Sequence, residues 1–378
     1  MISKTKRYML AMCSFLALDA YGYAEQPNGV ANCEFELGHG VNASHWLAQH
    51  FDTLPSKNEF FTKEDVLFLK KEGFDHLRIP VEESELWNAD GSMNEESFQF
   101  LDSALGWAKE AGMKAILDLH IVNAHHFNAE NEGNGHKNTL FTSEAAQEHL
   151  VDMWMVLSDR YSKESNDFLA YEILNEAVAE DHEDWNKLVA KCIQAIRERE
   201  PDRYLVIGSN RWQQTQFFPY LKIPEGDKKI ILSFHFYTPL AFTHYKASWV
   251  GEYANYDGPI NYPGYIVPEK LMEALPDGGI KDKLEDNPYN TKKTLRKEML
   301  PAIDYAKKHG LKLYCGEWGC LPTVPREMRL QWYRDMSRIF LEEGIDNAIW
   351  SYKTEFGIRS NDGEIADEEL IKAILTGE

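Results

Sequence analysis

The chain contains 378 residues, of which 43% are hydrophobic and 12% are aromatic, so it is long and apolar enough to bury a large globular core. Its formal net charge of −21 predicts a surface that repels nucleic acids and anionic membranes and favours neutral or cationic partners, although the same acidity also serves solubility alone. This composition excludes a disordered chain.

Residues 1–24 have the features of a secretory signal peptide. Three basic residues lie within the first seven positions, the apolar stretch "YMLAMCSFLAL" follows, and small residues occur at Gly22 and Ala24. The apolar stretch is too short to span a bilayer, and no later stretch is long and apolar enough to do so. We therefore expect cleavage near Ala24, a mature domain of residues 25–378 and a secreted or periplasmic location, with an uncleaved N-terminal helix as the alternative.

Short β-rich runs alternate with longer amphipathic patterns from residue 34 onward. This alternation is typical of parallel β/α units, and eight such strands make the closed α/β barrel, the (β/α)8 TIM barrel. The expected strands are residues 34–41, 74–80, 113–121, 168–174, 203–209, 230–236, 311–316 and 345–351. No fixed-period repeat and no linker divides the chain, so we expect a single domain.

Helix signals occupy the intervals between these strands. The segment 62–73 begins with the capping residue Thr62 and ends at Gly73, with acidic residues in its first turn and basic residues in its last. The other expected helices cover 94–112, 142–163, 182–200, 291–310 and 326–344, and Asn94 and Thr142 or Ser143 can cap the first two.

The connection after the sixth strand, from Tyr237 to about Tyr289, is much longer than a normal βα loop. It is expected to be a functional flap or to contain small elements of its own. Its aromatic residues suit a carbohydrate cleft, but they also suit a segment that packs on itself. They are Phe242, Tyr245, Trp249, Tyr253, Tyr256, Tyr262 and Tyr265.

Removal of the signal peptide would leave four cysteines, which are Cys33, Cys192, Cys315 and Cys320. Four cysteines allow two disulfides in an exported protein, but the sequence does not determine the pairing. Cys192 shares a helical face with apolar residues, so we expect a buried thiol there. No cysteine or histidine spacing typical of a zinc site occurs.

Polar residues lie at the ends of most predicted strands. In α/β barrels the reactive groups lie at these carboxyl ends, where the βα loops begin. The residues concerned are Arg78, His120, Asn175, Glu176, His235, Tyr237, Glu317 and Trp350. Each could be an ordinary polar rim residue, but that explanation has to hold at nearly every strand, so we expect a ring of functional side chains.

Glu176 and Glu317 end the fourth and seventh predicted strands. Strands three steps apart in an eight-stranded ring face each other across its mouth, so the two carboxyl groups are expected to converge. Hydrolysis of a glycosidic bond needs such a pair, because one group must donate a proton to the leaving oxygen while the other, ionised, attacks the anomeric carbon. A separation of about 5–5.5 Å would retain the anomeric configuration.

The order of motifs resembles the retaining glycoside hydrolases of family 5, the cellulase family. The resemblance covers about residues 40–353, and its motifs are "GVNASHWL" (40–47), "LRIPV" (77–81), "ILDLH" (116–120), "EILNEA" (172–177), "HFYTP" (235–239), "FTHYKASW" (242–249), "GEWG" (316–319) and "WSYK" (350–353). Two departures, Ala177 in place of the usual proline and the middle of "FTHYKASW", affect the expected substrate preference more than the reaction.

The resemblance implies a role for each matching residue. Glu176 would be the acid/base and Glu317 the nucleophile, and Asn175 would bond the sugar 2-hydroxyl. His120 and His235 would position hydroxyls and the acid/base, and Trp350 would form the floor under the sugar. The neighbours supply a physical basis, because the Arg78 cation and the Tyr237 hydroxyl can hold Glu317 ionised, whereas Glu176 lacks a cationic partner and can keep a raised pKa.

Other residues are weaker candidates for substrate contacts. His125 and His126 follow the third strand, where a sugar contact and simple loop packing are both open, and Trp212 is a better stacking platform than Trp46 because it lies just past its strand. His39, Asn42 and His45 are similarly placed. No ligand set at barrel spacing accompanies them, so neither a metal nor another cofactor is expected.

The sequence thus predicts a secreted, monomeric endo-β-1,4-glucanase that acts on a β-glucan polysaccharide or oligosaccharide. A β-mannanase, a xyloglucanase or an exo-β-1,3-glucanase on the same scaffold is the alternative. A glycan-binding protein without activity is a further alternative, which the paired carboxylates oppose.

Overall fold

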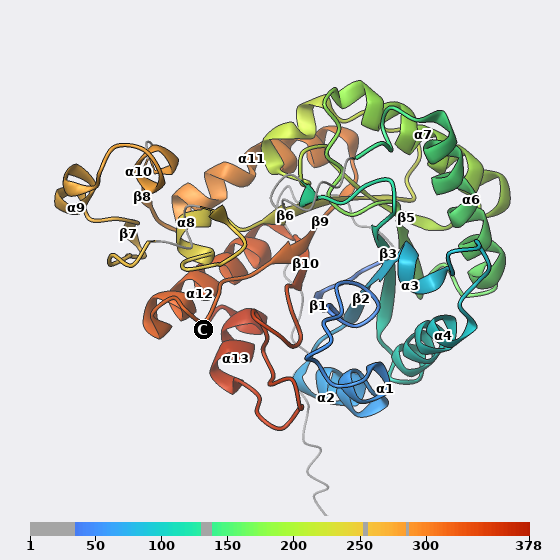
Figure 1. Cartoon of the computed structure of the whole chain (residues 1–378), viewed down its shortest axis with the longest axis horizontal. Helices are drawn as coiled ribbons and strands as arrows, with labels where there is room; N and C mark the ends of the chain where they lie inside the picture. The colour runs from blue at the N-terminus through green and yellow to red at the C-terminus, as the bar shows by residue number, and fades with distance from the viewer. Residues whose placement is uncertain (1–34, 130–137, 252–255, 285–286) are drawn as a thin grey trace, which may run out of the picture.

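The computed structural model describes residues 35–129, 138–251, 256–284 and 287–378 (Figure 1). The predicted signal peptide, Cys33 and Tyr253 lie outside these ranges, so the expectations about them stay predictions. None of the helices in the described part of the chain combines the length and the apolarity that crossing a bilayer requires.

Eight parallel strands close into a barrel in the order β1-β10-β9-β6-β5-β4-β3-β2. Their bounds are β1 His39–Asn42, β2 His76–Glu82, β3 Lys114–Ile121, β4 Leu169–Glu172, β5 Tyr204–Gly208, β6 Ile230–Phe236, β9 Lys312–Trp318 and β10 Asp346–Ile349. Helices surround this ring (Figure 1). The predicted (β/α)8 fold and all eight predicted strands are therefore confirmed.

The first strand begins later than predicted. The backbone N–H of Leu37 donates to a side-chain oxygen of Asp346 at 2.8 Å, and Gly38 has a left-handed φ of 59°. A left-handed residue cannot continue extended backbone. Ladder pairing with β10 therefore starts at His39, opposite Asn347.

The helices of the barrel follow the predicted caps. Thr62 and Asp65 form a capping box, and Gly73 ends that helix with a φ of 106°. Asn94 and Ser143 accept from backbone N–H groups at the starts of the helices Glu95–Glu110 and Glu144–Tyr161. The helices are α1 Lys57–Phe60, α2 Lys63–Glu72, α3 Glu83–Leu86, α4 Glu95–Glu110, α6 Glu144–Tyr161, α7 His182–Arg199, α8 Leu240–Thr243, α9 Glu269–Ala274, α10 Ile280–Lys283, α11 Lys292–His309, α12 Arg326–Glu343 and α13 Glu368–Thr376, with the 3₁₀ helix η1 at Thr215–Tyr220.

The long connection after β6 contains small elements of its own. It includes α8, α9 and α10, and its strand β7 (Gly264–Tyr265) pairs antiparallel with β8 (Tyr289–Asn290). Figure 1 shows β7, β8, α9 and α10 to one side of the barrel. Phe242, Tyr256 and Tyr262 are buried, so much of the aromatic content packs within the protein, while Trp249 remains 40% exposed.

Residues on β3 alternate between the inside and the outside of the barrel, as the two-residue period of a strand requires. Ile116 belongs to an interior cluster that includes Tyr314 and Ala348, whereas Leu117 and Leu119 pack in the outer core under the helices. The inward positions that follow Ile116 are Asp118 and His120. The barrel interior is therefore apolar at its amino end and polar at its carboxyl end.

The three described cysteines are buried free thiols. The prediction of a buried thiol at Cys192 is confirmed, and burial raises its pKa to about 12. Two disulfides would need all four mature cysteines, so the two bridges that the sequence allows do not form.

Candidate active site

Glu317 lies on β9 at the carboxyl end of the barrel and is 5% exposed. One of its oxygens accepts from Nη1 of Arg78 at 2.8 Å, and the other accepts from the Tyr237 hydroxyl at 2.9 Å. Burial raises the pKa of Glu317, while the Arg78 guanidinium and the Tyr237 hydroxyl oppose that rise by stabilising the carboxylate. Of the two predicted carboxyl groups, Glu317 therefore ionises first.

Glu176 follows β4 and is 8% exposed. Its Oε1 lies 2.8 Å from Nδ1 of His235, and no lysine or arginine of the described chain forms an ion pair with it. Burial, followed by the negative charge of Glu317, raises the pKa of Glu176 well above its ordinary value. Burial also lowers the pKa of His235 well below its ordinary value, so a neutral imidazole faces a carboxyl group whose protonated form is favoured.

The two carboxyl groups are close to each other. One atom each from Glu176, His235 and Glu317 lie within 4.8 Å of one another. The two carboxyl groups therefore lie close enough to act on the same bond of a ligand. The same three residues have the atom types of a metal site, but the Arg78 cation beside Glu317 disfavours a second cation there.

Asn175 is completely buried beside Glu176. Its side-chain oxygen accepts from Nη2 of Arg78 at 2.9 Å, while its side-chain nitrogen has no partner among the described residues. A buried amide without a partner is costly unless something fills the site. The amide N–H groups of Asn175 are thus available to a ligand hydroxyl.

His120 and Trp350 form an aromatic wall from β3 and the end of β10. Their rings stack with centroids 5.5 Å apart and an interplanar angle of 7°. His120 Nδ1 lies 2.6 Å from a carboxyl oxygen of Asp118, and its Nε2 has no partner among the described residues. Burial lowers the pKa of His120 to about 3, so the ring is neutral.

The Cellulase family (glycosyl hydrolase family 5) matches residues 39–356 of this chain. The chain belongs to glycosyl hydrolase family 5. It is 33% identical to endoglucanase C of Acetivibrio thermocellus over 346 residues, which cover 89% of this chain and 97% of that protein. It is 28% identical to cellodextrinase A of Ruminococcus flavefaciens, over 88% of this chain and 91% of that protein.

Solved structures share the fold of this family 5 chain. The crystal structure of endoglucanase Cel5A from Thermotoga maritima superposes with a TM-score of 0.69 at 23% identity, covering 89% of this chain and 97% of that one. The cellulose synthase subunit Z from Clostridioides difficile superposes with a TM-score of 0.71 at 21% identity, covering 90% and 100%. These structures show the shared fold, whereas the family match and the endoglucanase relatives identify the protein as an O-glycosyl hydrolase of the cellulase family.

The weaker candidates for substrate contacts in this family 5 enzyme lie at different depths in the protein. Trp212 is partly buried at the edge of the site, and its indole N–H donates to the Phe127 carbonyl at 3.0 Å. His125 is fully buried and its Nε2 accepts the Val178 N–H at 3.1 Å, so it supports the segment after Glu176, and a sugar contact there stays a prediction. Trp46 is fully buried, which excludes it as a stacking platform.

Sequence reasoning missed two carboxyl groups below the family 5 site. Asp118 and Glu172 point into the barrel and contact the Arg78 guanidinium at 3.0 and 2.7 Å. Burial raises the pKa of Asp118 to about 7, although Arg78 opposes the rise. The two-residue period of the strand could have revealed Asp118, because it precedes His120 by two positions.

An aromatic group extends the site on the side of Tyr237. The Tyr237 ring lies 5.1 Å from His244, which lies 5.4 Å from Phe356, and Trp249 follows at 6.4 Å from Phe356. Trp249 is the most exposed member. It belongs to the long connection that the sequence associated with a carbohydrate cleft, and its contacts with His244 and Phe356, which both contact Tyr237, support that interpretation for this one residue.

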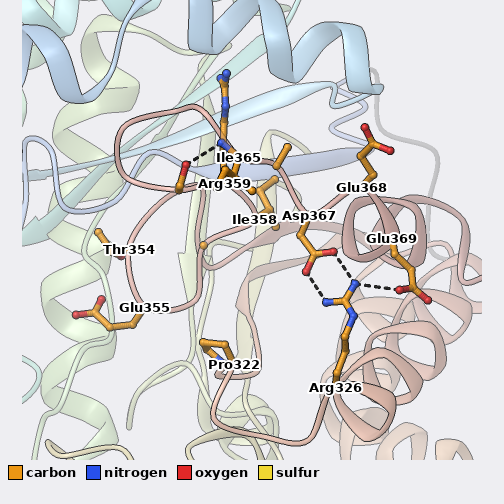
Figure 2. Close-up of a pocket in the computed structure, with 13 residues that line it drawn as sticks. Pro322, Arg326, Thr354, Glu355, Ile358, Arg359, Ile365, Asp367, Glu368 and Glu369 are labelled. Atoms are coloured by element: carbon orange, nitrogen blue, oxygen red, sulfur yellow. Dashed lines mark hydrogen bonds and ion pairs between the residues drawn. The ribbon is translucent and has the colours of Figure 1, made fainter.

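A hollow of about 610 Å³ lies between the loop after β10 and the starts of α12 and α13 (Figure 2). Arg326 is one of its lining residues and forms ion pairs with Asp367 at 2.8 Å and with Glu369 at 2.9 Å. None of the predicted site residues lines it. The chemistry of the family 5 enzyme is therefore assigned to the barrel mouth and not to this hollow.

Proposed function

We propose that the protein is a retaining endo-β-1,4-glucanase that works by double displacement. The observation that carries this proposal is the pair Glu176 and Glu317, which lie within 4.8 Å through one atom each and have opposite surroundings. Glu317 is held by a cation and a hydroxyl, and Glu176 is held by a neutral imidazole. Such a pair starts the reaction in opposite protonation states.

In the first step the ionised Glu317 attacks the anomeric carbon while Glu176 donates its proton to the leaving glycosidic oxygen. A covalent glycosyl-enzyme forms. In the second step Glu176, now ionised, removes a proton from water, and the water oxygen attacks the anomeric carbon and releases Glu317. Two inversions at one carbon retain its configuration.

The neighbouring side chains would bind and orient the sugar in this mechanism. The free amide N–H groups of Asn175 would donate to the 2-hydroxyl, a contact that strengthens in the transition state. The unpartnered Nε2 of His120 would meet another hydroxyl, and Trp350 would provide the floor. His235 would position Glu176, and Trp212 and Trp249 would stack on sugars farther from the cleaved bond.

The names of the relatives support a β-1,4-glucan as the substrate. One is an endoglucanase and another is a cellodextrinase, so soluble cellooligosaccharides are also candidates. A Thermotoga maritima Cel5A structure is described with a mannotriose substrate, which keeps a β-mannanase as the alternative on the same scaffold. Xyloglucan and β-1,3-glucan belong in the same test. We also propose that residues 1–24 are a signal peptide, that residues 25–378 form a monomeric catalytic domain, and that the enzyme is secreted or periplasmic.

Two measurements test this function. Proton NMR of cellotetraose hydrolysis is expected to show the β-anomer of the new reducing end first, and an initial α-anomer would refute the double displacement. A panel of carboxymethyl-cellulose, mixed-linkage glucan, xyloglucan, laminarin and mannan is expected to give the fastest release of mixed-length products from a β-1,4-glucan. Release of only monosaccharide or disaccharide units would exclude endo action.

A further inference from the structure

Gln213 lies in the loop after β5, directly beside the acid/base candidate Glu176, and the mechanism above gives it no role. Its side chain is 1% exposed and folds over Gly208. A Cβ at position 208 would lie 2.2 Å from Cγ of Gln213, so the glycine provides the space that this side chain fills. The position is therefore specified by packing.

The backbone around Gln213 has an uncommon conformation. Arg211, Trp212 and Gln213 have φ values of 59°, 61° and 53°, and Glu176 has a φ of 43°. Left-handed backbone is unfavourable for residues other than glycine, and it persists only where other contacts hold it, frequently at functional sites. Two such segments face each other here, so the contacts between them matter.

The side-chain amide of Gln213 joins the two segments. Its Oε1 accepts the backbone N–H of Glu176 at 2.8 Å, and its Nε2 donates to the Ser233 hydroxyl at 3.0 Å and to Oε1 of Glu172 at 3.4 Å. The orientation of the amide is fixed, because a backbone N–H can only donate. The left-handed backbone of Glu176 thus depends on Gln213 for the partner of its N–H.

The main chain of Gln213 also holds the second partner of Glu176. The Gln213 carbonyl accepts the backbone N–H of His235 at 3.1 Å, and His235 Nδ1 lies 2.8 Å from Oε1 of Glu176. Gln213 therefore fixes the origin of the Glu176 side chain and the imidazole that meets its carboxyl group. The side chain of Gln213 thus holds the backbone of Glu176, and its main chain holds the imidazole that contacts the carboxyl group.

We propose that Gln213 is a positioning residue for the acid/base Glu176 and that its amide keeps the carboxyl group aimed at the leaving oxygen. This inference rests on the proposed double-displacement function. It predicts a selective defect, because proton donation to a poor leaving group suffers while nucleophilic attack by Glu317 does not.

The test uses Gln213→Met, which keeps the length of the side chain and removes its hydrogen bonds. The values of kcat/KM are compared on cellotetraose, whose leaving group needs a proton, and on 2,4-dinitrophenyl β-cellobioside, whose leaving group departs without one. Each rate is divided by the concentration of active sites, which is measured by titration with the 2-deoxy-2-fluoro analogue of 2,4-dinitrophenyl β-cellobioside. The matched control is Gln214→Met, because the Gln214 side chain contacts Gln216 and not Glu176.

We expect Gln213→Met to lose at least about tenfold in kcat/KM on cellotetraose and less than about threefold on the activated substrate. The alkaline limb of its pH profile should move to lower pH, because a carboxyl group released toward solvent is less desolvated. Equal losses on both substrates with an unchanged pH profile would overturn the inference, as would the same selective loss in Gln214→Met. Failure of the wild-type enzyme on both substrates would instead refute the proposed function.

Ser233→Ala provides a second variant if Gln213→Met does not fold. It removes the nearer of the two acceptors of Nε2 of Gln213 and leaves the contact with Glu172 at 3.4 Å. A loss in kcat/KM that is smaller than in Gln213→Met, but again larger on cellotetraose than on the activated substrate, would support the inference. No loss, or an equal loss on both substrates, would overturn it.

Discussion

Two arginines are completely buried among the residues that the structure describes, and their surroundings differ. Arg203, at the amino end of β5, pairs with one carboxylate, Glu200, and donates its other N–H groups to backbone carbonyls. Arg78, in the barrel interior, contacts three carboxyl groups, those of Asp118, Glu172 and Glu317. One buried charge is balanced, and the other is shared among more acids than it can neutralise.

This difference separates a structural site from a reactive one. The three guanidinium nitrogens of Arg203 and both carboxylate oxygens of Glu200 have partners, so this pair offers nothing to a ligand. Around Arg78, burial raises the pKa of Asp118, Glu172 and Glu317, so the protein keeps protons on some of its acids. Shifted pKa values and unpartnered polar atoms in one place are the features expected of a catalytic centre.

The largest effect is expected at the two glutamates above Arg78. Glu317→Ala and Glu176→Ala should each reduce cellooligosaccharide hydrolysis on the order of 10⁴-fold, because each removes a group that takes part in bond changes. Azide should restore turnover of 2,4-dinitrophenyl β-cellobioside in both variants, with the α-glycosyl azide from Glu317→Ala and the β-glycosyl azide from Glu176→Ala. Unimpaired turnover in either variant, or the same azide anomer from both, would contradict the assignment.

Matched substitutions of the two buried arginines test whether their roles differ. Arg78→Met should lower kcat/KM by about 10²-fold or more and move the acid limb of the pH profile to higher pH, because the pKa of Glu317 loses the cation that opposes its rise. Arg203→Met should destabilise the fold by about 3–5 kcal/mol, since Glu200 is left unpaired, and leave kcat per folded molecule unchanged. Denaturant unfolding measures the stability of both variants, and pH profiles measure their activity. A loss of kcat in folded Arg203→Met would contradict the purely structural role of Arg203.

A smaller effect is expected from the exposed aromatic residues of the long connection after β6. Trp249→Ala should lower kcat/KM on cellotetraose by about threefold to tenfold, because one stacking surface is lost. Tyr265→Ala is the matched control, since Tyr265 is 36% exposed and packs on Tyr289 of the small sheet. Equal effects of the two substitutions would mean that Trp249 has no special relation to the cleft.

The smallest effect concerns thermal stability. Burial and the Glu317 charge raise the pKa of Glu176 in the folded protein above its ordinary value of 4.5. The native state therefore holds a proton on Glu176 that the unfolded chain has released at neutral pH. The contribution of Glu176 to the free energy of unfolding thus falls as the pH rises above 4.5. Glu176→Gln should raise Tm by about 1–2 °C at pH 7 and leave it unchanged below about pH 4 in calorimetry. A gain that is the same at both pH values would contradict this linkage.

The sequence predicts the barrel well because each strand carries its own local signal. The bounds of β6, residues 230–236, agree with the prediction, and the helix caps at Thr62 and Asn94 need only nearby residues. The polar ring follows for the same reason, because strand ends can be read once the strands are known. Local patterns thus account for the fold and for the two central carboxyl groups.

The supporting residues could not be read in the same way. The position of the Gln213 side chain depends on three successive left-handed residues and on the space above Gly208. No sequence pattern predicts either feature. The burial of Trp46 depends on the helix whose carbonyl at Lys57 accepts its N–H. These contacts arise from tertiary packing, which the order of residues alone does not display.

Closure of β1 on β10 has a consequence for synthesis of the chain. Arg78 and Glu317 are separated by 239 residues, and Asn42, which contacts Arg78, also donates to carbonyls of Gly316 and Ile349. A nascent chain that has left the ribosome only through its first half holds Arg78 with Asn42, Asp118 and Glu172, but it lacks Glu317. The reactive centre is thus absent from every intermediate that lacks the last strand, and activity should appear only after translation is complete.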